Sequence, residues 1–204
     1  MITIIDYGVG NIGSITNMLD RIGQPYEIGN DVTYITNARA LLLPGVGAAG
    51  VGMQNLRRYS MDIAIKNAVS KRVPFLGICL GMQLLFDRSE ENDTTCLGIL
   101  PGTVNKFSVE RKIPQIGWNV VTPRTKNSLS AALFKGIPQE SEFYYVNSYF
   151  PKPEDASIVA ATSSYGETFA GVVAKDSIVA TQFHPEKSGA MGLQFIKNFM
   201  KEFI

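Results

Sequence analysis

The first half of the chain alternates short apolar runs with longer segments whose apolar residues recur at helical spacing. The runs at 2–6 and 40–43 are typical of buried strands, whereas 12–22 repeats apolar residues every three or four positions. We expect strands at 2–6, 26–29, 40–43 and 73–78, and helical segments at 12–22, 53–56, 63–69 and from Met82 to Phe86. Such alternation predicts an α/β fold with a mostly parallel central sheet covered by helices on both faces.

After Pro101 the pattern changes to short strands separated by turns. We expect strands at 103–107, 118–121, 143–146, 157–162, 169–174 and 178–183, and a closing amphipathic helix at 193–203. Consecutive strands without helices between them predict an antiparallel extension of the sheet. Since 204 residues without repeats or low-complexity linkers suit one core, we expect residues 1–204 to form a single domain.

A cysteine stands between two glycines directly after the apolar run 73–78, in Gly77-Ile78-Cys79-Leu80-Gly81. A nucleophile on a sharp strand-to-helix turn needs small neighbours, because the backbone there is strained and crowded. The start of the following helix favours negative charge, and hence the thiolate. The segment predicts a nucleophilic Cys79, although an arbitrary cysteine is more often a small buried apolar residue.

The only histidine follows a β-branched run near the C-terminus, in Phe183-His184-Pro185-Glu186. Pro185 disfavours helical geometry at His184, and in extended backbone the side chains two positions apart point to one face. Glu186 should therefore orient the imidazole, which makes Cys79, His184 and Glu186 a nucleophile–base–carboxylate triad. The alternative is a satisfied core histidine beside a surface glutamate.

The composition and the net charge mainly exclude classes of function. A formal net charge of +1 without a basic patch or acidic tail argues against nucleic acid as a partner. The apolar runs are too short to span a bilayer and no signal-like segment opens the chain, so we expect no membrane association. One histidine and no C-x-x-C leave no metal constellation. Cys79 and Cys96 can pair in principle, but a nucleophilic Cys79 must be free, which fits a reducing cytoplasm.

The two segments around Cys79 and His184 resemble the nucleophile elbow and the His-x-Glu pair of the class I (triad) glutamine amidotransferases. The resemblance covers nearly the whole chain and is closest to the glutaminase subunit of imidazole glycerol phosphate synthase. Its most specific mark is Pro44-Gly45-Val46-Gly47, supported by Asp6-Tyr7-Gly8-Val9-Gly10-Asn11, Gly117-Trp118-Asn119 and Pro185-Glu186-Lys187-Ser188. It implies a flavodoxin-like fold, no cofactor, and hydrolysis of glutamine to glutamate and ammonia.

The resemblance also implies roles for residues around the triad. The backbone N–H of Leu80 would form an oxyanion hole together with the segment of Val46 and Gly47, after a peptide flip that the glycines make inexpensive. Gln83 and Glu91 would hold the amino-acid end of glutamine. For Glu91 the alternative is an exposed charge in the polar run 89–93.

A partner is implied because the chain has no ammonia-acceptor site of its own. By resemblance this partner is the cyclase subunit, a (β/α)8 barrel that forms a heterodimer and receives ammonia through an internal tunnel in histidine biosynthesis. Trp118, Asn119, Tyr144 and Lys187 are the candidates for the contact and the ammonia gate. Core packing is the alternative explanation for Trp118 and Tyr144.

Two positions depart from the usual pattern of the family. Gln115 and Asn147 stand where the family usually has histidine, and by resemblance both lie on the partner or substrate side. This leaves open a paralogue that feeds ammonia to another synthase, such as a sugar amidotransferase of surface polysaccharide assembly. A non-catalytic binding homologue is disfavoured by the intact Cys79, His184 and Glu186.

A more distant alternative comes from the glycine-rich opening. Gly8-x-Gly10-x-x-Gly13 matches the dinucleotide fingerprint between a strand and a helix, with Glu27 near the expected acidic position. The same glycines belong to the opening of the resembled family. An NAD-binding protein would leave the triad without a role.

Overall fold

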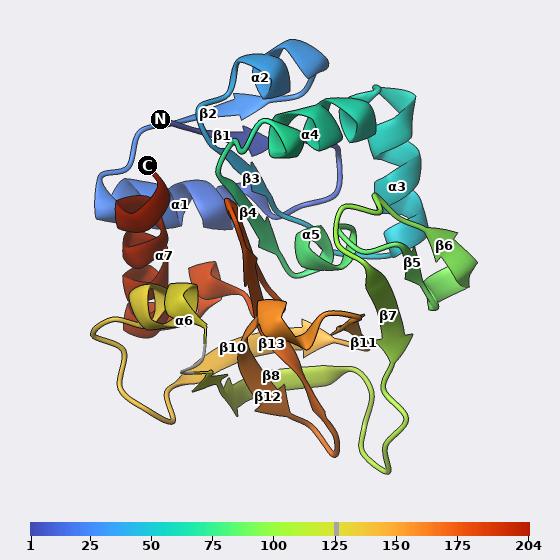
Figure 1. Cartoon of the computed structure of the whole chain (residues 1–204), viewed down its shortest axis with the longest axis vertical. Coiled ribbons are helices and arrows are strands. Elements are labelled where there is room, and N and C mark those ends of the chain that lie inside the picture. The colour runs from blue at the N-terminus through green and yellow to red at the C-terminus, as the bar shows by residue number, and fades with distance from the viewer. Residues whose placement is uncertain (125–126) are drawn as a thin grey trace.

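An eight-stranded sheet forms the centre of the computed structural model, which describes residues 1–124 and 127–204 (Figure 1). The strands lie in the order Tyr26–Gly29 (β2), Ile2–Ile5 (β1), Leu41–Leu43 (β3), Phe75–Ile78 (β4), Ile178–Thr181 (β14), Thr168–Lys175 (β13), Val159–Ser164 (β12) and Thr122–Pro123 (β9). The first five are parallel, and β13, β12 and β9 continue antiparallel. The predicted parallel sheet with an antiparallel extension is confirmed.

Helices cover both faces of the parallel half, as Figure 1 shows. One face carries α1 (Ile12–Ile22) and α7 (Gly189–Phe203), and the other carries α2 (Val32–Asn37), α3 (Ala49–Arg58) and α4 (Met61–Ser70). The short helix α6 (Ser128–Leu133) packs beside α7 and contacts the antiparallel strands β12 and β13. The neighbouring residues Ile4 and Ile5 show why β1 is buried at every position: Ile4 packs in the cluster of Leu19, and Ile5 packs in that of Leu56. Among the described residues no helix combines the length and apolarity needed to cross a membrane.

Two smaller sheets lie beside the central one. The first pairs β8 (Gln115–Val120) with β10 (Glu142–Asn147) antiparallel, in the lower part of Figure 1 where β12 and β13 also lie. The second contains β11 (Tyr149–Pro153), β7 (Gly102–Lys106), β5 (Arg88–Ser89) and β6 (Thr94–Thr95). The strands expected near 103–107, 118–121 and 143–146 therefore form, but outside the central sheet. Short 3-10 turns at Glu91–Asp93 (η1), Ala156–Ile158 (η2) and Pro185–Lys187 (η3) complete the described elements.

The helix expected from Met82 to Phe86 is wrong in its position and length. The helix that follows the cysteine, α5, is a single turn, Leu80–Gln83. The next three residues are completely buried, and their carbonyls accept hydrogen bonds from the segment 97–100 instead of from a following helical turn. The apolar run Leu84-Leu85-Phe86 gives no amphipathic stripe, and here tertiary partners end the helix.

Candidate active site

The nucleophile candidate Cys79 sits at the carboxyl end of β4 in strained backbone. Its φ of 54° and ψ of −107° lie outside the regions that L-residues ordinarily occupy. The Cys79 N–H donates to the Thr181 carbonyl at 2.7 Å, which ties the turn to the end of β14. The predicted sharp strand-to-helix turn is present, and the Cys79 side chain is buried except for its access to a cavity.

The glycines on either side of Cys79 are required by close approach. A Cβ at Gly81 would collide with the carbonyl oxygen of Leu43 in β3, and one at Gly77 would lie 2.8 Å from the Gly81 oxygen. Small residues therefore let the turn fold back against the sheet. Because α5 has only one turn, its dipole stabilises a negative charge at Cys79 only weakly. The Leu80 N–H, which has no acceptor inside the helix, is the group that can donate to an anion here.

The base candidate His184 follows β14 in extended backbone, directly before Pro185. Its Nδ1 lies 2.7 Å from Oε1 of Glu186, and both side chains are only 3% exposed. The Ser188 hydroxyl donates to the His184 carbonyl at 2.6 Å, and the His184 N–H donates to the Tyr144 carbonyl at 2.9 Å. The ring is thus held by a carboxylate and its backbone by two neighbouring elements.

The electrostatics of this pair favour a charged imidazole. Burial by itself lowers the pKa of His184, but the hydrogen bond and negative charge of Cys79, together with those of Glu186, raise that pKa to about 10. Burial, and then the charge of Cys79, raise the pKa of Tyr7 far above its usual range, so the Tyr7 hydroxyl stays neutral and donates to the Pro44 carbonyl at 2.8 Å. These shifts describe a charged imidazole beside Cys79 and a neutral Tyr7 hydroxyl.

A cavity of about 410 Å³ joins most of the residues that the sequence indicated. Its walls include Cys79, His184, Leu80, Val46, Gly47, Gln83, Glu91 and Lys187. Gln83 is buried, and Glu91 is half-buried with Oε2 accepting from the Ala49 N–H at 2.7 Å. The alternative of an exposed Glu91 charge is therefore wrong.

The loop opposite the nucleophile is anchored at one end and open at the other. A Cβ at Gly45 would lie 2.5 Å from the Tyr7 hydroxyl and 2.8 Å from the Leu80 Cβ, so this residue packs directly on the elbow. Gly47 has a φ of +97° with free space around it, and Val46 is 41% exposed. The peptides at 46–47 are consequently the part of this loop that can rotate without displacing the core.

Trp118, Asn119 and Tyr144 lie on the β8–β10 ribbon outside this cavity. Trp118 is 54% exposed and packs edge-to-face on Tyr144, its cross-strand partner, with ring centroids 6.0 Å apart. The core alternative is therefore wrong for Trp118. Asn119 donates through Nδ2 to the Ser164 carbonyl at 2.9 Å, which links β8 to β12.

The two unusual residues of the sequence are direct neighbours. Gln115 and Asn147 pair across the β8–β10 ribbon and are both buried. Their side-chain oxygens, Oε1 of Gln115 and Oδ1 of Asn147, have no hydrogen-bond donor among the described residues. The two departures from the family pattern are therefore adjacent in the structure, and Asn147 itself lines the catalytic cavity.

One polar residue of the site was not singled out from the sequence. The Gln182 side chain is completely buried, and its Nε2 lies 3.6 Å from Cys79 Sγ. The signal was present, because Gln182 stands two positions before His184 in an extended segment and shares its face.

The glycine-rich opening makes internal contacts that explain it as a turn. The Gly8 N–H donates to Asp6 Oδ1 at 3.1 Å, and Asn11 caps α1 by accepting from the Ser14 N–H at 3.1 Å. No cluster of three or more potential metal ligands occurs within residues 1–124 and 127–204.

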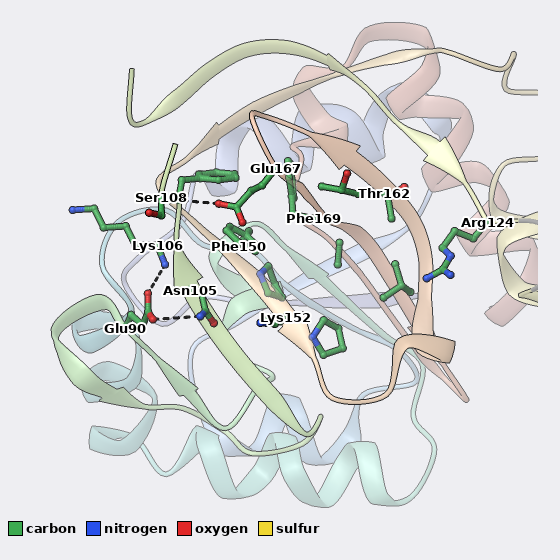
Figure 2. Close-up of a pocket in the computed structure, with 16 residues that line it drawn as sticks. Glu90, Asn105, Lys106, Ser108, Arg124, Phe150, Lys152, Thr162, Glu167 and Phe169 are labelled. Atoms are coloured by element: carbon green, nitrogen blue, oxygen red, sulfur yellow. Dashed lines mark hydrogen bonds between the residues drawn. The ribbon is translucent and has the colours of Figure 1, made fainter. Parts of the chain in front are cut away.

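A larger cavity of about 770 Å³ lies away from this chemistry, between β7, β11 and the β12–β13 pair (Figure 2). It shares no lining residue with the catalytic cavity. Figure 2 shows its two carboxylates engaged by the chain itself: Glu90 accepts from the Lys106 N–H at 2.6 Å, and Glu167 accepts from the Ser108 N–H at 3.2 Å. We therefore assign the chemistry to the smaller cavity.

Comparison with known proteins agrees with this geometry. Residues 3–203 match the family model described as "Glutamine amidotransferase class-I". The chain is 45% identical to the imidazole glycerol phosphate synthase subunit HisH of Dehalococcoides mccartyi, over 98% of this chain and 97% of that protein. It is 44% identical to the subunit named HisH 2 of Methanococcus maripaludis, over 99% of this chain and all of that protein. A solved structure of a glutamine amidotransferase shares the fold, with a TM-score of 0.77 over 98% of both chains at 16% identity.

Proposed function

The chain belongs to the class I glutamine amidotransferases, and from that premise we propose that it is the glutaminase subunit of imidazole glycerol phosphate synthase in histidine biosynthesis. It hydrolyses glutamine to glutamate and ammonia through Cys79, His184 and Glu186. The observation that carries the proposal is the elbow cysteine facing a cavity that it shares with a buried His184, itself bonded to Glu186. We infer that it works in the cytoplasm, where both buried cysteines stay reduced.

The reaction proceeds in two half-reactions at Cys79. The thiolate attacks the side-chain amide carbon of glutamine, and the protonated His184 gives its proton to the departing nitrogen, so that ammonia leaves and a γ-glutamyl thioester remains. Neutral His184 then removes a proton from water, which attacks the thioester and releases glutamate and the thiolate. Glu186 orients the ring and stabilises its charged form in both halves.

The oxyanion of each tetrahedral intermediate needs preorganised donors. We propose the Leu80 N–H as one of them and a peptide N–H of the Val46–Gly47 segment as the other, after that peptide rotates. The anchoring of Gly45 on the elbow and the open surroundings of Gly47 support this division. Hydrolysis of glutamine should therefore be slow until the Val46–Gly47 peptide has rotated to complete the oxyanion hole.

Gln83 and Glu91 are proposed to hold the amino-acid end of glutamine. Nε2 of Gln83 is already bonded within the chain, which leaves its Oε1 to accept from the α-ammonium group. Glu91 supplies the opposite charge from the cavity wall, and Ala49 already positions its carboxylate.

The ammonia acceptor is proposed to be a separate cyclase subunit, a (β/α)8 barrel that forms a heterodimer with this chain. Trp118 offers an exposed aromatic surface, and its neighbour Tyr144 contacts the His184 backbone. A partner that docks at Trp118, Asn119, Tyr144 and Lys187 would thus be linked to the catalytic base through two contacts. Trp118 packs on Tyr144, and the Tyr144 carbonyl accepts from the His184 N–H. This connection supports activation by the partner.

A paralogous glutaminase for another synthase is the second candidate. The specific observation that favours it is the adjacent pair Gln115 and Asn147, with two buried oxygens without a donor in the described chain. The number in the name HisH 2 also indicates that some organisms hold more than one such subunit. A sugar amidotransferase is the kind of acceptor that this candidate would serve.

The test measures glutamate release from the chain alone, with the barrel cyclase, and with the cyclase and its ribulosyl substrate. Since one oxyanion donor is worth about a hundredfold to a thousandfold in rate, the complete system should exceed the lone chain by at least about a hundredfold. Full activity of the lone chain would contradict the coupling. Activation by a sugar-modifying synthase, but not by the cyclase, would favour the paralogue.

A further inference from the structure

A line of three polar contacts connects a backbone carbonyl to the nucleophile. The Gln83 Nε2 lies 3.0 Å from the Tyr149 carbonyl oxygen and 3.0 Å from the Gln182 side-chain oxygen. The Gln182 Nε2 in turn lies 3.6 Å from Cys79 Sγ. The residues are far apart in sequence, and their contacts are made only inside the folded site.

We propose that Gln182 donates a hydrogen bond to the Cys79 thiolate, and that Gln83 holds the Gln182 amide in the orientation this bond requires. The proposal rests on the proposed function in taking Cys79 as the nucleophile. Gln182 is then a positioning residue for the reacting sulfur. It adds a neutral donor to the triad.

The orientation of the two side-chain amides follows from the Tyr149 carbonyl at the end of this series of contacts. The Tyr149 carbonyl can only accept, so the Gln83 atom that faces it must be the amide nitrogen. The same nitrogen faces Gln182, whose nearer atom must then be the oxygen. The remaining amide group of Gln182, which faces the sulfur, is therefore the NH2 donor. Backbone chemistry thus settles both amide orientations.

Burial strengthens the hydrogen bond that the Gln182 amide donates to the sulfur. Gln182 is 0% exposed and Gln83 is 6% exposed, so bulk water does not compete for either amide. On another side of the sulfur, the Val146 carbonyl lies 3.8 Å away and can only accept from the neutral thiol. Gln182 supplies the matching partner for the thiolate.

The other groups around the sulfur do not duplicate this role. His184 interacts with it but must release its proton during the reaction. Tyr7 gives its hydroxyl hydrogen to the Pro44 carbonyl, and Glu91 accepts from the Ala49 N–H. Lys187 lines the same cavity but is exposed and makes no hydrogen bond to the sulfur among the described residues. An amide neither gains nor loses a proton in the working pH range, so Gln182 remains a donor through both half-reactions.

The experiment uses the full chain in a Cys96→Ser background, in which Cys79 is the only thiol. The rate of alkylation by iodoacetamide is measured against pH without glutamine, because this neutral probe reports the thiolate independently of substrate binding. Gln182→Met keeps the side-chain length and removes the donor, and Gln83→Met removes its support. Gln194→Met, which breaks a glutamine contact on α7 far from the sulfur in sequence, is the matched control.

The midpoint of the alkylation profile should rise by about one pH unit in Gln182→Met, since a hydrogen bond to a charged group is worth about that much at its weaker end. Gln83→Met should shift it in the same direction by less, and this variant tests the proposal even if Gln182→Met does not fold. Gln194→Met should leave it unchanged. Unshifted midpoints in folded Gln182→Met and Gln83→Met would overturn the role of Gln182, whereas glutamine hydrolysis surviving in Cys79→Ser would overturn the proposed nucleophile as well.

Discussion

Replacing Glu186 with glutamine is the sharpest test of the electrostatics at this site. The change removes one negative charge 2.7 Å from the His184 Nδ1, between two side chains that are both 3% exposed. Glutamine keeps nearly the same shape and retains an oxygen that can still accept from the ring. The substitution therefore isolates charge from packing.

The expected size follows from the pair itself. An opposite charge within hydrogen-bonding reach changes a pKa by about one to three units. The pKa of His184 should thus fall from about 10 to roughly 7–9 in Glu186→Gln. This corresponds to about 1.4–4 kcal/mol less preference for the imidazolium. Because a protonated ring is needed to expel ammonia, the alkaline limb of the pH–rate profile should move to lower pH by the same amount.

The assay is direct, because His184 is the only histidine of the chain. Its ring Cε1–H gives a single imidazole resonance by NMR, and the midpoint of its pH titration is read without assignment. Glu202→Gln, an exposed carboxylate on α7, is the matched control and should leave the midpoint unchanged.

The reasoning would be refuted by a parent resonance that titrates near the unperturbed value of about 6.5. It would also fail if Glu186→Gln left the midpoint where it was in the parent protein. In the first case the surroundings do not favour a charged His184 ring, and in the second the Glu186 carboxylate does not stabilise that charge.

Three further substitutions test other parts of the site and its frame. Cys79→Ser should abolish glutamine hydrolysis in the partnered enzyme, as measured by glutamate release. Cys96→Ser should keep the parental turnover, because burial raises the pKa of the Cys96 thiol to about 11. Parental activity in Cys79→Ser would exclude this nucleophile. His184→Ala loses both thiolate formation and leaving-group protonation, so its rate should fall by about a hundredfold to ten-thousandfold and below that of Glu186→Gln; an equal rate in the two variants would argue against the base. Gly81→Ala should destabilise the fold by about 1–3 kcal/mol or more in urea unfolding. Gly13→Ala on α1, where a Cβ would meet only Asn11 Oδ1 at an ordinary contact distance of 3.9 Å, should stabilise it by up to about 1 kcal/mol; effects of the same sign would contradict the close-approach argument.

The sequence predicted the central sheet well because its strands are buried on both faces or end at strong turn signals. The helices α1 and α7 were found for a similar reason: each has an apolar stripe with polar residues opposite. The elements that were missed are short and depend on partners far along the chain. Strand β11 contains two prolines and pairs with β7 through residues 102–106, and β5 and β6 contain two residues each. Nothing local distinguishes such segments from loops.

The three residues of the proposed triad could be predicted from the sequence alone, because the constraints on them are local. The elbow requires small neighbours within two residues of Cys79, and the extended backbone around Pro185 sets His184 and Glu186 on one face. The tertiary structure alone decided what surrounds them. It buried Gln182 against the sulfur, brought Glu91 to the first N–H of α3, paired Gln115 with Asn147, and exposed Trp118. These facts arise from contacts between segments up to about a hundred residues apart, and no local pattern encodes which segments will meet.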